Sequence, residues 1–211
     1  MKDKEKTEIM LNALIERETS WGKGRTNIIF PELRLGSGYC GVAQRRIDLF
    51  EISSNAGNPT TAYEIKASRS DFKKDVKDDQ KQRGARLYAN EFYYVAPKGM
   101  LKYDEIPLWA GLMEFDFDAF EKYKQEKQLR DAYLYSWSVP VAAPLHPKYP
   151  PSWGLICAMI RHINKDIGKA TIAELQHENE QLKMAVSRQT DLLKRIARGD
   201  AYNKWELSRY E

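Results

Sequence analysis

Residues 45–50 and 61–66 each contain alternating apolar and polar side chains, at 47–49 and at 63–66, and turn formers (Asn-Ala-Gly-Asn-Pro, 55–59) separate the two segments. Alternation at every second residue is typical of β-strands, and a short run of turn formers between two strands favours a hairpin. The pattern therefore predicts a two-stranded hairpin. It also places Glu64 and Lys66 on one face of their strand, opposite the apolar residues.

Asp48 lies on the first of these strands, and antiparallel pairing would bring it beside Glu64. Two crowded carboxylates repel each other, and a proton or a cation relieves the repulsion. Mg²⁺ binds few protein oxygens and keeps several waters, and Lys66 alongside could hold a water or stabilise charge on a phosphate. The residues leave two interpretations open: a metal site, or a hairpin with a Glu–Lys pair and a turn-capping Asp.

The rest of the chain reads as alternating helices and strands, which predicts an α/β fold with a mixed sheet flanked by helices. A Ser at 68 or 70 is a helix N-cap, and the apolar run 92–96 is typical of a buried central strand. The remaining predicted elements are a helix over 4–18, a strand over 27–35 with Pro31 marking an edge or bulge, a strand within 106–115, a helix over 116–130, a strand over 133–139, a proline-rich loop from Pro140 to Pro151 and a helix from 153 to 163.

Composition narrows the class of protein. Hydrophobic residues make up 42% of the chain and charged residues 30%, and no apolar run reaches 18 residues, so we expect no membrane span. The charged N-terminus lacks the apolar segment of a signal peptide, which predicts a cytoplasmic protein. Cys40 and Cys157 lie far apart without a zinc-binding spacing and are expected to be free thiols.

The positive charge is concentrated in one segment. Residues 66–86 hold eight Lys or Arg and four Asp, a surplus equal to the +4 of the whole chain. A basic segment directly after a metal site suits a phosphodiester substrate, and the alternative is a solvated helix with charge pairs four residues apart. The residues expected to contact DNA are Arg46, Ser68, Arg69, Lys73, Lys74 and Lys77.

The Asp48, Glu64-Ile65-Lys66 arrangement resembles the core of the PD-(D/E)xK nucleases. Residues 64–75 (EIKASRSDFKKD) resemble the E-(I/V)-K-x-S-x-x-D-F-x-x-D run of the MmcB-like DNA-repair branch of that superfamily, and 91–97 and 107–113 resemble its next segments. The similarity extends over about residues 28–165. The stretch between Asp48 and Glu64 is longer than in the family, which should only lengthen a hairpin loop.

The resemblance implies a restriction-endonuclease-like fold and a metal-dependent DNA endonuclease. Asp48 and Glu64 would bind Mg²⁺ (or Mn²⁺) with the carbonyl of Ile65, and Lys66 would orient the attacking water or steady the transition-state charge. The products would carry a 5′-phosphate and a 3′-hydroxyl. Such an activity would belong to DNA repair, recombination, or phage or defence DNA processing.

Three further residues are candidates for the site by the same resemblance. Many members of the superfamily carry an extra carboxylate on the first helix, where Glu16 lies here, and a helix glutamine near the site, where Gln80 lies. A strand glutamate of the resembling family corresponds to Glu32. The alternatives are a surface position for Glu16 and a salt bridge from Glu32 to Arg46 or Arg34.

The C-terminal part, 169–211, follows a heptad pattern and is expected to be a separate helical tail after a domain over 1–168. Asn179 falls at an a position, where a buried Asn fixes register and oligomer state, and Gln189 at d lowers the expected stability. A self-associating coiled coil giving a homodimer is predicted, the alternative being a helix folded onto its own domain. The a and d positions are Ile172, Leu175, Asn179, Leu182, Val186, Gln189, Leu193 and Ile196.

A second function class remains open beside the endonuclease. The fold could serve as a non-catalytic DNA- or protein-binding module, dimerised by the tail. Intact Asp48, Glu64 and Lys66 favour the nuclease, and uptake of Mg²⁺ or Mn²⁺ would separate the two, since a binding module need not take up a metal.

Overall fold

The computed structural model describes residues 1–20, 27–35, 45–78, 81–126 and 129–197. The chain divides into two compact units, Met1–His162 and Ile163–Glu211. The sequence predicts the division six residues later, after residue 168. The long helix α6 (Trp153–Ala197) runs without a break through both positions, so no turn or linker marks the boundary.

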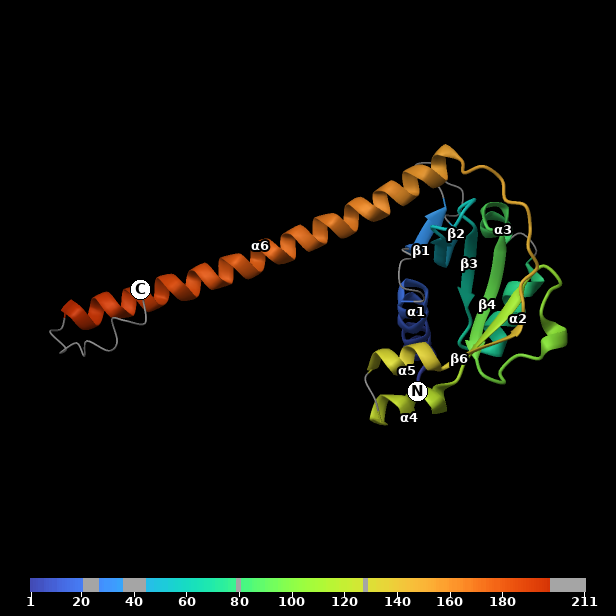
Figure 1. Cartoon of the computed structure of the whole chain (residues 1–211), viewed down its shortest axis with the longest axis horizontal. Helices are drawn as coiled ribbons and strands as arrows, with labels where there is room; N and C mark the ends of the chain where they lie inside the picture. The colour runs from blue at the N-terminus through green and yellow to red at the C-terminus, as the bar shows by residue number, and fades with distance from the viewer. Residues whose placement is uncertain (21–26, 36–44, 79–80, 127–128, 198–211) are drawn as a thin grey trace. The chain divides into compact units, whose positions relative to one another are not determined.

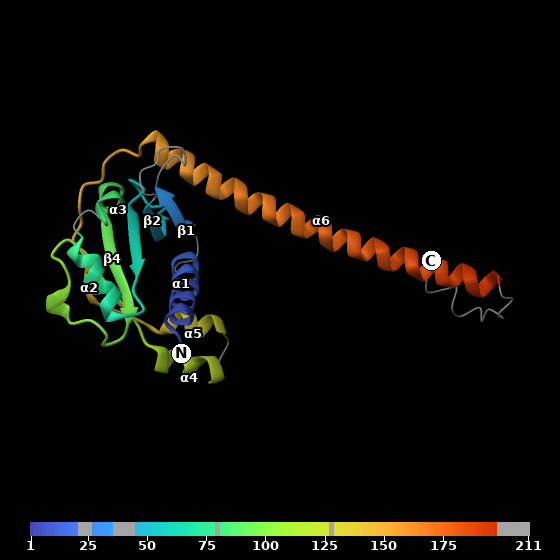
Figure 2. The same ribbon diagram turned by 180° about the vertical axis from the view of Figure 1, so that it is seen from behind.

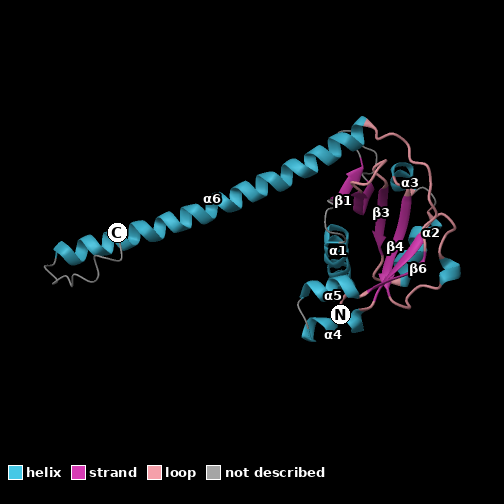
Figure 3. Ribbon diagram, viewed as in Figure 1, coloured by secondary structure: helices cyan, strands magenta, loops and turns pink. Residues whose placement is uncertain are grey.

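The first unit is built on one six-stranded mixed sheet whose strands lie side by side in the order in which they occur in the chain (Figure 3). The central pairs β3–β4 and β4–β5 are parallel and the other pairs are antiparallel. This confirms the predicted α/β class with a mixed sheet. The strands are β1 (Ile28–Leu35), β2 (Arg45–Ile52), β3 (Thr60–Ile65), β4 (Glu91–Pro97), β5 (Gly111–Phe115) and β6 (Trp137–Val141).

Helices cover both faces of the sheet (Figures 1 and 2). One face carries α1, α4 and α5, and the opposite face carries α2, α3 and the first turns of α6. Beside α6, the helices are α1 (Asp3–Ser20), α2 (Arg69–Lys77), α3 (Arg83–Tyr88), α4 (Phe117–Glu126), α5 (Leu129–Tyr135) and the short 3₁₀ helix η1 (Tyr103–Glu105).

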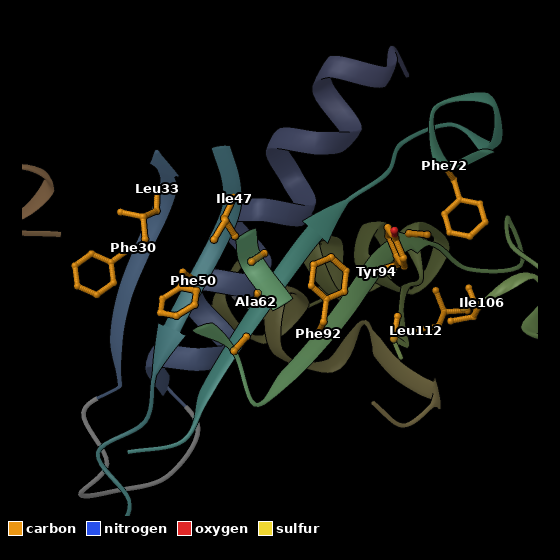
Figure 4. Close-up of a cluster of buried hydrophobic side chains, with 14 of the residues drawn as sticks. Phe30, Leu33, Ile47, Phe50, Ala62, Phe72, Phe92, Tyr94, Ile106 and Leu112 are labelled. Carbon is orange, nitrogen blue, oxygen red and sulfur yellow. The ribbon is translucent and has the colours of Figure 1, made fainter. Parts of the chain in front are cut away.

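Alternation along the strands produces two apolar cores, one on each face. On the α2 face, Tyr94 of β4 packs edge-to-face against Phe72 of α2 and Phe92 of its own strand, with ring centroids 5.0 and 5.2 Å apart (Figure 4). On the α1 face, Met10 and Leu14 are fully buried in the second core. The sheet is thus held from both sides at its middle strands, which carry the candidate site.

Several predicted elements are confirmed. β1 lies at an edge of the sheet and contains Pro31, and the next residue, Glu32, has a positive φ of 52°. β4 lies between β3 and β5, as its continuous apolar run indicates. The turn between β2 and β3 uses Gly57 and Asn58 at φ values of 81° and 44°, where Gly and Asn are least strained.

The prediction was wrong around residues 133–141. Residues 133–135 complete α5, and the last strand, β6, begins at Trp137. Pro140, which was expected in a rigid loop, lies inside β6. Because β6 is the other edge of the sheet, a residue without an N–H donor is tolerated there.

Of the second unit, the structure describes the C-terminal part of α6, and the side chains of Ile172, Gln189, Leu193 and Ile196 lie outside the described part. Three of the predicted a and d residues, Leu175, Leu182 and Val186, are exposed, each by about 60% (59%, 59% and 61%). Asn179 is exposed as well. No described helix is both long and apolar enough to cross a membrane.

Candidate active site

The β2–β3 hairpin brings the predicted acidic residues together. Leu49 pairs with Tyr63, so that Asp48 and Glu64 are the next residues along the two strands. Leu49 and Tyr63 are the last pair of the ladder at this end, and beyond them Oδ2 of Asp48 accepts a hydrogen bond from the backbone N–H of Ile65 at 2.9 Å. The first carboxylate is therefore fixed to the backbone of the strand that carries Glu64 and Lys66.

A pocket of about 490 Å³ opens at this point. Its lining includes three carboxylates and three cations, and a fourth carboxylate, Asp75, lies behind Lys66, so the site has one more negative than positive charge. Such a site attracts a cation. The lining residues are Thr7, Arg46, Asp48, Glu64, Ile65, Lys66, Asp71, Lys81 and Gln82.

Glu64 has one oxygen engaged and one free. Its Oε1 accepts a hydrogen bond from Nζ of Lys66 at 2.8 Å, whereas Oε2 is buried and has no hydrogen-bond partner among the described residues. Burial, reinforced by the charge of Asp48, raises the pKa of Glu64 to about 7 although Lys66 opposes the shift. A buried acceptor without a partner is costly, and a bound cation or proton at Oε2 would remove that cost.

Asp48 shares this environment. Burial raises the pKa of Asp48, and the hydrogen bond from Ile65 and the charges of Lys66 and Arg46 only partly offset that effect. Nη2 of Arg46 lies 3.7 Å from Oδ1 of Asp48. Two carboxylates with raised pKa values in one pocket are the arrangement that a divalent cation stabilises.

Lys66 is buried among carboxylates, with only 3% of its side chain exposed. Its Nζ lies 2.8 Å from Glu64, 3.2 Å from Asp75 and 3.5 Å from Asp71. Burial alone would lower the pKa of Lys66, but Glu64, Asp75 and Asp71 outweigh it and hold that pKa above its ordinary value. The side chain is therefore a fixed positive charge at the pocket.

Asp75 is the last residue of the run 64–75 that carries the family resemblance, but it was not among the predicted site residues, and a solvated helix was one of the two interpretations of its segment. The structure buries Asp75 completely, in contact with Lys66, Lys81, Gln82 and Tyr94. Burial alone would raise the pKa of Asp75, yet Lys81 and Lys66 outweigh it and lower that pKa. Its position three residues after the apolar Phe72 is the signal that could have placed it on the buried face.

The accessory candidates lie in different places. Glu32 forms the salt bridge to Arg46 that was one of its two interpretations, at 3.0 Å, and does not line the pocket. Glu16 accepts from Arg130 of α5 at 2.9 Å and is not among the lining residues either. Gln80 is outside the described residues. The glutamine that the structure does bring to the pocket is Gln82.

The basic segment is partly engaged in the fold. Ser68 is the N-cap of α2, as predicted, and its Oγ accepts from the N–H of Asp71. Arg69 forms an ion pair with Glu105. The three lysines of α2 expected to contact DNA are exposed: Lys73, Lys74 and Lys77.

The donor set for a metal is small. The described residues contain no group of three or more His, Cys, Asp or Glu side chains arranged to hold a metal ion. Asp48 and Glu64 with the carbonyl of Ile65 would leave the rest of the shell to water and substrate, as Mg²⁺ commonly does. Of the two cysteines, Cys157 is an exposed free thiol and Cys40 lies outside the described residues.

The opposite face of the sheet carries another buried carboxylate. Glu51 of β2 accepts from Asn27 at 2.6 Å and from the hydroxyl of Tyr63 at 2.9 Å. Burial, and to a smaller extent the charge of Glu18, raises the pKa of Glu51 to about 7. Since both of its oxygens have partners, Glu51 is a part of the fold that titrates near neutral pH.

No protein-family model matches the sequence, and no curated protein matches it. Among solved structures, the chain is similar to the SPO1766 protein of unknown function from Silicibacter pomeroyi. The TM-score is 0.41 with 16% sequence identity, and the alignment covers 70% of this chain and 78% of the other. A structural similarity of this size gives no information about activity. Any proposal about activity therefore rests on the geometry of the pocket.

Proposed function

We propose that this chain is a metal-dependent DNA endonuclease of the PD-(D/E)xK kind, with a restriction-endonuclease-like core. The observation that carries the proposal is the free buried oxygen of Glu64, placed in one pocket with Asp48 and Lys66. The predicted triplet was derived from strand alternation and motif resemblance. That a buried acceptor lies open among these three residues is an independent reason to expect a ligand there.

The residues present fit a divalent cation. Asp48 and Glu64 would hold Mg²⁺ or Mn²⁺ with the Ile65 carbonyl, and the bound ion would polarise the scissile phosphate and lower the pKa of a water. Lys66 would orient the attacking water and neutralise charge on the phosphoryl oxygens. The water oxygen bonds to phosphorus as the P–O3′ bond breaks, and the departing oxygen takes up a proton. The products are a 5′-phosphate and a 3′-hydroxyl.

The DNA would approach along the basic surface beside the pocket. Arg46 and Lys81 line the pocket, and both are about half exposed (side chains 50% and 41%), so they can reach a phosphate. Lys73, Lys74 and Lys77 add exposed charge on α2. Such contacts would supply affinity without base specificity, because they reach the backbone and no base edge.

The proposed function includes a homodimer formed by α6. Leu175, Leu182 and Val186 expose apolar side chains at heptad spacing, and Asn179 lies on the same seam. A second copy of the same seam would bury them. Two nuclease domains in one particle could then cut both strands of a duplex. A monomer mass in solution would refute the proposed dimer.

Metal uptake distinguishes the nuclease from a non-catalytic binding module on the same fold. Titration calorimetry with Mn²⁺ should show one site per chain in the wild type and none in Asp48→Asn or Glu64→Gln. Glu32→Gln is the matched control, since Glu32 is a nearby carboxylate that does not line the pocket, and it should bind as the wild type does. Equal uptake of Mn²⁺ by all four proteins, or no uptake by the wild type, would refute the proposed metal site and favour the non-catalytic binding module.

A further inference from the structure

Lys66 is held by three carboxylates, which differ in their exposure to water and in whether they would also bind the proposed metal. Glu64 lies closest, but the proposed metal would draw on the charge of Glu64 and weaken its hold on Lys66. Asp71 lies 3.5 Å away and its side chain is 55% exposed, so water screens its charge. Asp75 lies 3.2 Å away with no exposed side-chain surface. Of the three, Asp75 alone is both buried and outside the proposed metal shell.

The two oxygens of Asp75 have separate partners. Oδ2 accepts from Nε2 of Gln82 at 2.9 Å and from the hydroxyl of Tyr94 at 3.0 Å, and both donors are buried. Oδ1 faces the ammonium groups of Lys66 and Lys81. Two uncharged donors thus fix the orientation of the carboxylate, and the oxygen that remains is directed at the lysines.

The donors are themselves fixed by the fold. Tyr94 is fully buried in the central strand, and its ring packs edge-to-face on Phe72, one turn before Asp75 on α2. Gln82 is the N-cap residue of α3. The contact between Asp75 and Lys66 therefore connects the catalytic strand β3 to β4, α2 and α3.

We propose that Asp75 is the positioning residue for Lys66: it holds Nζ at the pocket whether or not Glu64 is occupied by a cation. This inference rests on the proposed function, because it assigns Asp75 a role in keeping the lysine in place for phosphodiester hydrolysis. Asp75 touches neither metal nor substrate and acts through Lys66. A displacement of about 1 Å at a reacting group can cost about 100-fold in rate, so a positioning contact of this kind is expected to matter.

Asp71→Asn and Asp75→Asn are a matched pair, since each removes one carboxylate near Lys66 at nearly equal volume. We expect Asp75→Asn to lower kcat for DNA cleavage about 10- to 100-fold at unchanged KM. Asp71→Asn should lower kcat less than Asp75→Asn does, because water screens the charge of Asp71. The readout independent of activity is the ¹H–¹⁵N signal of the Lys66 ammonium, which is visible when the group is rigidly hydrogen-bonded. With saturating Mg²⁺, so that Glu64 is occupied, the signal should be present in the wild type and in Asp71→Asn and lost in Asp75→Asn.

The result that overturns the inference is a Lys66 ammonium signal as sharp in Asp75→Asn as in the wild type. Loss of that signal in a protein that cuts no DNA would support the positioning contact while refuting the nuclease. Should Asp75→Asn not fold, the double variant Gln82→Leu/Tyr94→Phe keeps the carboxylate and removes both donors to its Oδ2. The Lys66 signal should then broaden, and an unchanged signal would contradict the inference.

Discussion

Asp48 and Ile65 are joined by a hydrogen bond of 2.9 Å, from the backbone N–H of Ile65 to Oδ2 of Asp48, across the end of the β2–β3 ladder. The bond fixes a carboxylate beside the backbone of the residue between Glu64 and Lys66. It leaves the other oxygen of Asp48 directed toward Arg46, 3.7 Å away. Asp48 is therefore both a part of the hairpin and a candidate ligand, and substitutions can separate these roles.

Asp48→Asn and Asp48→Ala should differ in stability. Asn keeps an acceptor for the N–H of Ile65, and the variant should lie within about 1 kcal/mol of the wild type in free energy of unfolding. Ala leaves that donor without its partner and should be less stable than Asn by about 1–3 kcal/mol. Urea denaturation measures both. Equal stability of the two variants would show that the hydrogen bond does not hold the hairpin.

The stability of the fold should decrease with rising pH because of Glu51. The pKa of Glu51 is about 7 in the folded chain against an ordinary value of 4.5, so the folded state binds this proton more tightly than the unfolded state. Its contribution is fully present below about pH 4.5 and is lost as the pH rises through about 7. A shift of that size corresponds to at most about 3 kcal/mol.

Glu51→Gln tests the pH dependence directly. The variant should lose much less stability than the wild type between pH 5 and pH 8 in thermal or urea unfolding. The pH dependence that remains in the variant is due to Glu64, whose pKa is also about 7. Glu126→Gln, an exposed position on α4, serves as the control and should follow the wild-type curve. If Glu51→Gln also follows the wild-type curve, Glu51 does not govern the pH dependence of stability.

Gly111 and Gly154 should respond oppositely to alanine. A Cβ at Gly111 in β5 would come within 2.6 Å of the backbone nitrogen of Ala143 and closer still to the ring of Tyr93. Gly111→Ala should therefore lose about 1–3 kcal/mol of stability. At Gly154 the nearest atom is Oγ of Ser152 at 3.7 Å, so Gly154→Ala should be neutral or gain less than about 1 kcal/mol. A tolerated Gly111→Ala would show that the sheet can shift there.

Leu182→Asp should abolish the proposed dimer. Leu182 falls at a d position and is 59% exposed in the single chain, so a charge there would be buried in the seam of a two-stranded coiled coil. Gln181→Asp, at the neighbouring outward c position, is the control. Light scattering should give a dimer mass for the wild type and the control and a monomer mass for Leu182→Asp. A wild-type monomer would contradict the proposal outright.

The middle of the sheet was predictable from the sequence for a simple reason. Alternation over 63–66 assigns Glu64 and Lys66 to one face, and the turn formers before the strand favour an antiparallel partner, which brings Asp48 alongside. These steps are local, and each depends on one hairpin. The N-cap at Ser68 is equally local and was also predicted.

The cluster behind Lys66 was not predictable in the same way. Asp75 meets Tyr94 only because α2 packs on β4, which lies 19 residues further along the chain. No periodicity in the sequence specifies that contact. The strand expected over 133–139 was wrong for a different reason: alternating aromatic residues such as Tyr133, Tyr135 and Trp137 satisfy a strand pattern, while the chain uses the first two to complete α5.

The most direct test of the nuclease is cleavage of labelled single-stranded, duplex and branched DNA with Mg²⁺ or Mn²⁺. Wild type, Asp48→Asn, Lys66→Ala and Lys74→Ala are compared, the last as a control for loss of a lysine on the exposed face of α2. We predict metal-dependent cutting by the wild type, a modest loss of binding in Lys74→Ala, and no cutting by Asp48→Asn or Lys66→Ala. Absence of cutting on every substrate, or cutting that survives in Asp48→Asn and Lys66→Ala, would contradict the proposed nuclease activity.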